Sequence, residues 1–420
     1  MATPTETLAT AGLSIRMETT VKAFLPVAYA LAARGKIGPE DIDLANGENS
    51  LMKLEMVDIC KKAMSDSITA NIFATPVGFV GDTPVKEALA QYFTNYFHPA
   101  NSVTADYIVP TAGSGSALDA LLYTLCDAGD AVLCPAPAWW GYHPYARFHA
   151  EANIIPAFVK PSSSSSWVTD CLSSAIIPAM EAAYNAAPDP RRIKAVLTSN
   201  PNNPMMNCWA KDVVRQMMDF CHERNLHYIS DEVFANTVFD TEADQFVSAL
   251  SLLKSPDSEG DGAAMKSLID PSLVHVLWST SKDFGACGVR AGCVVSYHSL
   301  VRAGVSFATG WQVSSLAAHF TRKLLISDSL PNLISSVWAQ LAQGFQTCRE
   351  ILSTPELFGR IEVLHISAGL WANALNGVIV GGATEFAPFL QKEQGLLKIT
   401  FAMPPDALLQ GPERLKASLL

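Results

Sequence analysis

Short apolar runs, each bounded by polar or turn-forming residues, recur along this 420-residue chain. The segments between them space their apolar residues as a helix does, as in 85–97. Apolar strands that alternate with helices are typical of a parallel sheet buried on both faces. The pattern therefore predicts an α/β fold with a mostly parallel central sheet and surface loops at 162–166 and 254–264. The apolar runs are Ala131–Cys134, Ala195–Thr198, Leu226–Ser230 and Leu273–Trp278.

The pattern changes after about residue 305. Ser314 to about Leu352 is predicted to be one long helix, and short strands follow it. A chain of this length usually forms more than one domain. We therefore predict a large domain over residues 55–305, and a smaller α+β domain in which 1–54 combine with 306–420.

Charge, cysteine usage and hydropathy exclude several classes of protein. The net charge is −11 and there is no basic run, which argues against a nucleic-acid partner. No uninterrupted apolar stretch reaches membrane-spanning length, and the first residues do not have the pattern of a signal peptide. The nine cysteines are scattered without a CxxC pair, which indicates reduced thiols and no metal site. The expected location is the cytoplasm.

The segment Leu277–Gly292 carries the clearest chemical signal. Ser279 precedes Lys282 by three residues, and Arg290 follows it by eight. A lysine amine can form a Schiff base with an aldehyde when its pKa is lowered, and an arginine pairs bidentately with phosphate. Both tasks belong to the binding of pyridoxal phosphate, although two solvated surface charges are the commoner explanation of such a pair.

A Gly/Ser turn precedes a predicted helix. Ser114, Gly115 and Ser116 lie between the short strand that begins at Tyr107 and an apolar helix from Ala117. Free backbone N–H groups and the helix dipole favour an anion there. The simpler alternative is that the turn only starts the helix.

Three further residues follow predicted strands, at the end where ligands bind in open α/β sheets. Trp139 could stack on a flat ring, although core packing is the commoner role of a tryptophan. Asn203, in a proline-set loop, could direct its amide to a ring oxygen, or the loop could be a plain turn. Asp231 could hold a pyridine nitrogen protonated, or could cap a turn.

In this order, these motifs resemble the class I/II aminotransferase family of fold type I pyridoxal phosphate enzymes. The segments Leu44–Asn49 and Ser279–Gly285 are most similar to its 1-aminocyclopropane-1-carboxylate synthase-like branch. The resemblance runs from about residue 40 to about residue 405. It implies a fold type I transferase with pyridoxal 5'-phosphate as cofactor and a small amino-acid-type substrate. It also implies a homodimer whose active site lies near the subunit boundary.

The resemblance also implies a role for each matching residue. Lys282 would form the Schiff base and move protons, and Asp231 would pair with the pyridine nitrogen. Asn203 would bind the phenolic oxygen, Trp139 would stack on the ring, and Gly47 would lie in the arm that closes on substrate. The phosphate would be held by Ser114, Gly115, Ser116, Ser279 and Arg290.

Three positions depart from the family pattern. Phe234, beside the ring, and Phe79 both stand where tyrosines are usual. Lys398 falls where an arginine normally clamps the substrate carboxylate, so it is the expected substrate-binding residue. Lysine cannot make the bidentate fork, which puts an ordinary transaminase reaction in doubt.

The cofactor supports more than one reaction once a proton has left the substrate Cα. Reprotonation at the cofactor gives transamination, loss of a group from Cβ gives a lyase, and attack at Cγ gives ring closure. Phe234, and Trp209 after the Asn-Pro loop, are similar to carbon–sulfur β-lyases. We therefore expect β-elimination on a cysteine conjugate in secondary metabolism, with transamination as the alternative. A non-catalytic binding protein of the same fold is a minor alternative, because the predicted cofactor residues are intact.

Overall fold

The computed structural model describes most of the chain. Phe79 and the predicted loops at 162–166 and 254–264 lie outside the described residues. The structure describes residues 12–34, 42–44, 47–74, 81–160, 170–243, 245–253, 269–310, 312–357, 361–376 and 395–419.

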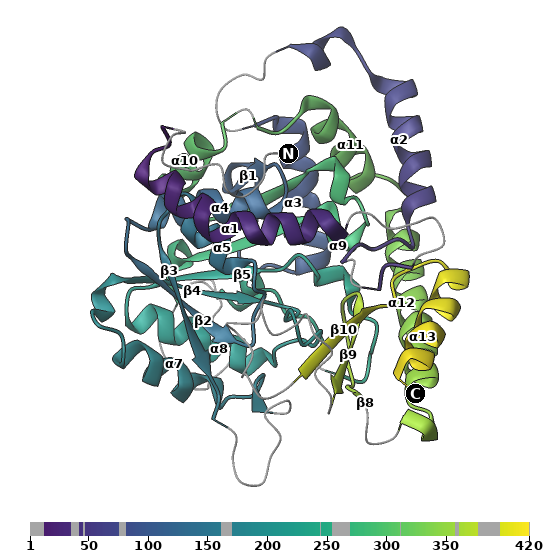
Figure 1. The fold of residues 1–420 in the computed structure, drawn as a ribbon. Helices are drawn as coiled ribbons and strands as arrows, with labels where there is room; N and C mark the ends of the chain where they lie inside the picture. The colour runs from purple at the N-terminus through teal and green to yellow at the C-terminus, as the bar shows by residue number, and fades with distance from the viewer. Residues whose placement is uncertain are drawn as a thin grey trace, which may run out of the picture.

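A seven-stranded sheet forms the centre of the molecule, in the order β1-β7-β6-β5-β4-β2-β3 (Figure 1). Strand β7 runs antiparallel to both of its neighbours, and the other strands are parallel to one another. This arrangement confirms the predicted α/β fold with a mostly parallel sheet. The strands are β1 (Ile108–Thr111), β2 (Ala131–Ala136), β3 (Asn153–Phe158), β4 (Ile193–Ser199), β5 (His227–Asp231), β6 (Val274–Ser279) and β7 (Gly292–Ser296).

Helices cover both faces of this sheet, which explains why most residues of its central strands are buried. Val132 and Cys134 of β2 pack into the core under α4, α5 and α10, whereas Ala131 and Leu133 pack into the core on the other face. The first face carries α4 (Ser114–Leu125), α5 (Tyr142–Phe148) and α10 (Ser299–Ala308). The second carries α3 (Thr83–Phe97), α7 (Ile176–Asn185), α8 (Lys211–Glu223) and α11 (Ser315–Leu325).

A second, antiparallel sheet has the order β10-β9-β8. Helix α12 (Leu330–Leu352) packs against β9 and β8 and also against α13 (Pro405–Leu419). These elements lie together beside the large sheet (Figure 1). The strands are β8 (Ile361–Val363), β9 (Trp371–Asn376) and β10 (Gly395–Thr400).

The prediction of one long helix from Ser314 to about Leu352 is wrong. The chain leaves the helix after Leu325 and starts a new one at Leu330. Pro331 lies in the first turn of α12, where its missing N–H costs nothing, whereas inside a continuous helix it would remove a hydrogen bond.

The elements near the predicted domain boundary divide between the two sheets. Helix α11 lies beyond residue 305, yet it packs on α3 and on α2 (Lys53–Ser67). Helix α1 (Ile15–Arg34) packs on α5. In contrast, the backbones of Leu44 and Ser50 pair with Thr400 and Ala402 beside the small sheet. We therefore propose that the boundary lies after α11, with the segment around residues 44–50 joined to the small sheet.

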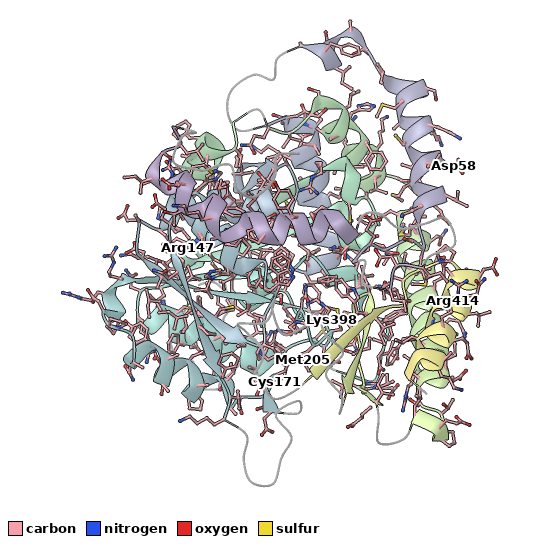
Figure 2. All side chains as sticks on the ribbon, viewed as in Figure 1. Asp58, Arg147, Cys171, Met205, Lys398 and Arg414 are labelled. Atoms are coloured by element: carbon pink, nitrogen blue, oxygen red, sulfur yellow. The ribbon has the colours of Figure 1, made fainter. Side chains whose placement is uncertain are left out.

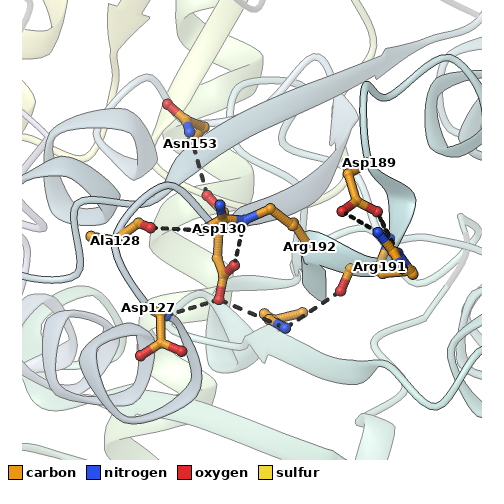
Figure 3. A network of polar contacts seen from close by, with 8 residues as sticks. Asp127, Ala128, Asp130, Asn153, Asp189, Arg191 and Arg192 are labelled. Carbon is orange, nitrogen blue, oxygen red and sulfur yellow. Dashed lines mark hydrogen bonds and ion pairs between the residues drawn. The ribbon is translucent and has the colours of Figure 1, made fainter.

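A network of charged groups holds the edge of the large sheet where β2, β3 and β4 begin (Figure 3). Asp130 is buried and receives Arg192 Nε at 3.0 Å, Lys194 Nζ at 3.8 Å and the Asp127 N–H at 2.9 Å. The carbonyl of Asp130 also accepts from the N–H of Asn153. The charges at this edge are therefore paired within the fold.

Three observations concern disulfides, membrane-spanning helices and metal sites. All nine cysteines are free thiols. Within the described ranges, none of the helices is long and apolar enough to cross a membrane. The same part of the chain holds no group of three or more His, Cys, Asp or Glu side chains placed to bind a metal ion.

Candidate active site

The predicted site residues meet at the opposite edge of the large sheet, where its parallel strands end. Strand β5 ends at Asp231 itself, and β6 leads directly into Lys282. Because β7 runs in the other direction, it begins at this edge, and Arg290 lies two residues before its first residue. This is where parallel α/β sheets place their ligands. Ser114, Trp139 and Asn203 follow the ends of β1, β2 and β4.

Lys282 lies in α9 (Thr280–Asp283), a single turn of helix that follows β6. Ser279 caps this turn, with its hydroxyl accepting from the Ser281 N–H at 3.4 Å. The Nζ of Lys282 donates to the carbonyl of Gly47 at 2.6 Å, and Asn49 Nδ2 donates to the carbonyl of Lys282 at 3.2 Å. The segment beside the small sheet thus holds both the backbone and the amine of Lys282.

The surroundings of Lys282 favour its neutral amine. Burial lowers its pKa from the ordinary value, and Arg290 acts in the same direction. The neighbouring Cys287, Glu48 and Asp231 oppose this shift. A lysine with a lowered pKa is the form that attacks a carbonyl group.

Asp231 is a buried carboxylate with few partners. The hydroxyl of Tyr142 donates to its Oδ2 at 3.0 Å, and the Val233 N–H lies 3.4 Å from its Oδ1. Burial raises the pKa of Asp231 to about 6, against the hydrogen bond from Tyr142, which lowers it. The carboxylate is therefore mostly ionised at neutral pH and retains unused acceptor sites.

Two glycines, Gly113 and Gly115, leave space beside Arg290. We call this space the phosphate cradle. Gly113 has φ +87°, and a Cβ on it would lie 2.8 Å from Arg290 Nη2. A Cβ on Gly115 would collide with the hydroxyl of Tyr145. Arg290 donates through Nη2 to the carbonyl of Ala112 and through Nη1 to that of Cys287, each at 3.0 Å. The guanidinium is thus fixed over the turn that begins α4.

The first turn of α4 completes this cradle. Ser114 and Gly115 open the helix, so their N–H groups have no partner within it and can face an anion. The hydroxyl of Ser116 donates to Gln312 Oε1 at 2.9 Å. Backbone donors, a helix dipole and a guanidinium together suit a phosphate group.

Trp139 lies between the phosphate cradle and Asp231. Its ring covers Gly141, where any Cβ would collide with the indole. The ring meets Tyr142 edge to face at 5.4 Å and lies 5.9 Å from Tyr145. Tyr142 in turn binds Asp231, so one aromatic group links the two halves of the site.

Lys398 approaches from the small sheet (Figure 2). Its Nζ donates to Asn203 Oδ1 at 2.8 Å and lies 4.0 Å from the centre of the Trp371 ring. Burial, and next the positive charge of Lys282, lower the pKa of Lys398 to about 7. This amine is therefore neutralised more readily than that of an ordinary lysine.

Trp371, the first residue of β9, contacts several of the predicted residues. A Cβ on Gly47 would lie 2.5 Å from the indole, so only glycine permits this approach. The buried Phe234 meets the ring edge to face at 5.6 Å, and Lys282 Nζ lies 5.9 Å from its centre. The amines of Lys282 and Lys398 thus both lie near the indole of Trp371.

These residues fit pyridoxal phosphate. The phosphate cradle would hold its phosphate, the buried Asp231 carboxylate has acceptor capacity for a protonated ring nitrogen, and Lys282 offers a desolvated amine. A sheet of this order with such a site defines a fold type I pyridoxal phosphate transferase.

Known sequences identify the family. The family described as aminotransferase class I and II matches residues 39–364. The chain is 32% identical to the probable aminotransferase aclI of Aspergillus oryzae, over 97% of this chain and 98% of that protein. It is 34% identical to 1-aminocyclopropane-1-carboxylate synthase 1 of Oryza sativa subsp. indica, over 57% of this chain and 46% of that protein.

Solved structures show the same fold. An aspartate aminotransferase mutant of Thermus thermophilus, complexed with tryptophan, superposes with a TM-score of 0.72 at 19% identity, over 97% of this chain and all of that one. The protein belongs to the class I/II aminotransferase family, in its 1-aminocyclopropane-1-carboxylate synthase-like branch. It is an enzyme, and its cofactor is pyridoxal phosphate.

The structure brings the predicted residues together and adds three that the sequence did not single out. Tyr142 holds Asp231, Asn49 holds the backbone of Lys282, and Trp371 lies under both lysines. Tyr142 had a local signal, because it follows Trp139 by three residues in the same aromatic cluster. No local pattern pointed to Trp371, since the residues that it contacts are distant from it in the sequence.

Proposed function

We propose that this enzyme is a carbon–sulfur lyase that removes sulfur from the β-carbon of a cysteine conjugate in secondary metabolism. The observation that carries the proposal is Lys398, which rests on Asn203 and Trp371 in the region expected to receive the substrate carboxylate.

Different residues are proposed to hold different parts of the cofactor. Ser279, Arg290 and the first turn of α4 would hold the phosphate, and Asn203 would bind the phenolic oxygen. Asp231 would pair with the pyridine nitrogen, while Trp139 would cover the ring. When bound, pyridoxal phosphate supplies an electron-withdrawing ring that stabilises negative charge at the substrate Cα.

Lys282 would then act as the base. Its Nζ accepts the proton from the substrate Cα, and the electron pair left there forms a double bond to Cβ as the Cβ–S bond breaks. The sulfur leaves as a thiolate and takes up a proton. Water hydrolyses the remaining enamine to pyruvate and ammonia. The hydrogen bond from Nζ to the Gly47 carbonyl orients the amine at one side of the site.

The chemistry of Lys398 favours elimination over exchange. A transaminase must bind two different acids in turn and hold each carboxylate in the same place, which a bidentate arginine does well. Lys398 is a point charge with a pKa lowered to about 7, so it holds a carboxylate by one contact and only while protonated. An elimination needs one amino-acid substrate and no second acid.

Transamination is the second candidate function. The names of the fungal relatives, which include the probable aminotransferases aclI of Aspergillus oryzae and gliI of Aspergillus fumigatus, favour it. Since the same first proton transfer serves both reactions, the two candidates differ only in the steps after that transfer.

Product analysis tests the proposal. The holoenzyme should release thiol, pyruvate and ammonia from a cysteine S-conjugate without an added keto acid. Strict dependence on a keto acid, with transfer of the amino group to it, would reject the lyase. As the control, Lys282→Ala should lack both the products and the visible absorbance of the lysine-linked cofactor.

We also propose a cytoplasmic homodimer. Leu54 of α2 is exposed by 79% and Phe73, in the turn that follows α2, by 78%; Leu300 and Phe307 of α10 are exposed by 74% and 68%. Large apolar side chains this exposed are often covered by a partner. Sedimentation should give about twice the monomer mass, and a monomer that retains full activity would reject the dimer.

A further inference from the structure

Asp283 directly follows Lys282 and is buried at the end of α9, outside the group of residues that would hold the cofactor. Its carboxylate is surrounded by donors from three different elements. They are Trp278 Nε1 at 2.8 Å, the Asn236 N–H at 3.0 Å, Asn236 Nδ2 at 3.3 Å and the Tyr92 hydroxyl at 3.3 Å.

Asn236 connects Asp283 to α12, the helix that packs on the small sheet. It lies in η5 (Ala235–Thr237), and both its backbone N–H and its amide donate to Asp283. Its own carbonyl accepts from Trp338 Nε1 at 2.8 Å, and Trp338 is a residue of α12. One asparagine therefore binds α9 on one side and α12 on the other.

Helix α12 packs on β9, which begins with Trp371. Trp371 lies 5.9 Å from Lys282 Nζ and 4.0 Å from Lys398 Nζ. Trp338 therefore belongs to the helix that packs on the strand beginning with Trp371.

We propose that Asp283 is a positioning residue, which fixes α9 to Asn236 and, through Trp338, sets the place of Lys282 relative to Trp371 and Lys398. The inference concerns the lysine that carries the cofactor, so it holds for elimination and for transamination alike. Displacing a catalytic lysine by about 1 Å can lower the reaction rate by up to about a hundredfold. Contacts that fix the position of Lys282 therefore matter for the rate.

The donor set requires an acceptor at position 283. Burial raises the pKa of Asp283 to about 7, and the hydrogen bonds from Trp278, Asn236 and Tyr92 oppose this shift. Tyr92 is the only titratable group among these partners, and burial together with Asp283 raises its pKa. An asparagine at position 283 would place an NH₂ group against donors, so Asp283→Asn breaks the network with little change of volume.

Two variants test the path from its two ends. Asp283→Asn removes the acceptor, and Trp338→Phe removes the donor to Asn236 while keeping an aromatic ring. The second variant loses one hydrogen bond of about 1 kcal/mol and should fold even if the first does not. The matched control is Phe345→Leu, which disturbs α12 against Phe239 and Phe401 without touching Asn236.

The measurement is the pH midpoint of the visible absorbance of the holoenzyme, which reports the protonation of the Lys282–cofactor linkage. Loosening α9 admits water to the linked nitrogen, so each variant should move the midpoint upward by about half a unit or more. The shift of the double variant should be smaller than the sum, because both act on one path. Phe345→Leu should lower the unfolding free energy and leave the midpoint in place. If Asp283→Asn and Trp338→Phe behave like Phe345→Leu, Asp283 is only structural and the proposal fails.

Discussion

The Nζ of Lys398 lies 4.0 Å from the centre of the Trp371 indole, close enough for a cation–π contact. This contact offsets part of the cost of holding the charged form of Lys398, whose pKa is lowered first by burial and then by the charge of Lys282. The region expected to receive the substrate carboxylate therefore consists of a point charge on an aromatic face. That geometry separates this enzyme from one with an arginine clamp.

Replacing Lys398 by arginine should strengthen the binding of simple α-amino acids. The guanidinium is charged at all working pH values and can form two hydrogen bonds with a carboxylate. We expect the KM for such amino acids to fall about threefold to tenfold, equivalent to about 1 kcal/mol. Lys398→Met, which keeps the length but not the charge, should raise it. Unchanged KM values in both variants would show that Lys398 does not bind the carboxylate.

Removing the Tyr142 hydroxyl should change the pH dependence of cofactor binding. That hydrogen bond lowers the pKa of Asp231, so Tyr142→Phe should raise it above its present value of about 6. Ionised Asp231 is the form that pairs with a protonated pyridine nitrogen. On acidification, the variant should therefore lose its affinity for pyridoxal phosphate at a pH about half a unit to one unit higher than the wild type does. Titrations of the apoprotein at a series of pH values measure this midpoint. Tyr145→Phe, whose hydroxyl faces Gly115, is the control and should not shift it; equal midpoints in all three proteins would contradict the role of Tyr142.

The large sheet explains why much of the site could be predicted from the sequence. Asp231 ends a strand, and Lys282 and Asn203 each follow one. Parallel strands end at one edge, so local patterns were enough to place these residues together. The contacts of Trp371 arise from the packing of the small sheet against the large one, which no local pattern specifies. The break before Pro331 had a local signal, but the apolar spacing continues on both sides and conceals it.

A pair of histidines, His275 buried and His227 half-buried, should make stability depend on pH. His227 Nδ1 lies 2.9 Å from His275 Nε2, and burial lowers the pKa of His227 from 6.5 to about 4 and that of His275 well below 6.5. Between those values the unfolded chain binds more protons than the folded one, so stability falls as the pH drops through this window. We expect a loss of about 2 kcal/mol from His227, whose partial exposure reduces the full effect. Denaturant unfolding at a series of pH values measures it, and His227→Gln should flatten the curve. An equally steep curve in His227→Gln would assign the acid sensitivity to other groups.

A methyl group at Gly113 should weaken cofactor binding more than it weakens the fold. The position has φ +87°, and the new Cβ would lie 2.8 Å from Arg290 Nη2, so Gly113→Ala must displace the guanidinium. We expect a loss of about 1–2 kcal/mol in stability from the backbone strain. Displacing the phosphate-binding group should also raise the dissociation constant of pyridoxal phosphate about tenfold. Gly288→Ala is the matched control in the segment that leads to Arg290, because its Cβ would meet no atom within 4 Å. The Gly288 variant should bind the cofactor as the wild type does, and equal dissociation constants in both variants would show that Arg290 does not hold the phosphate.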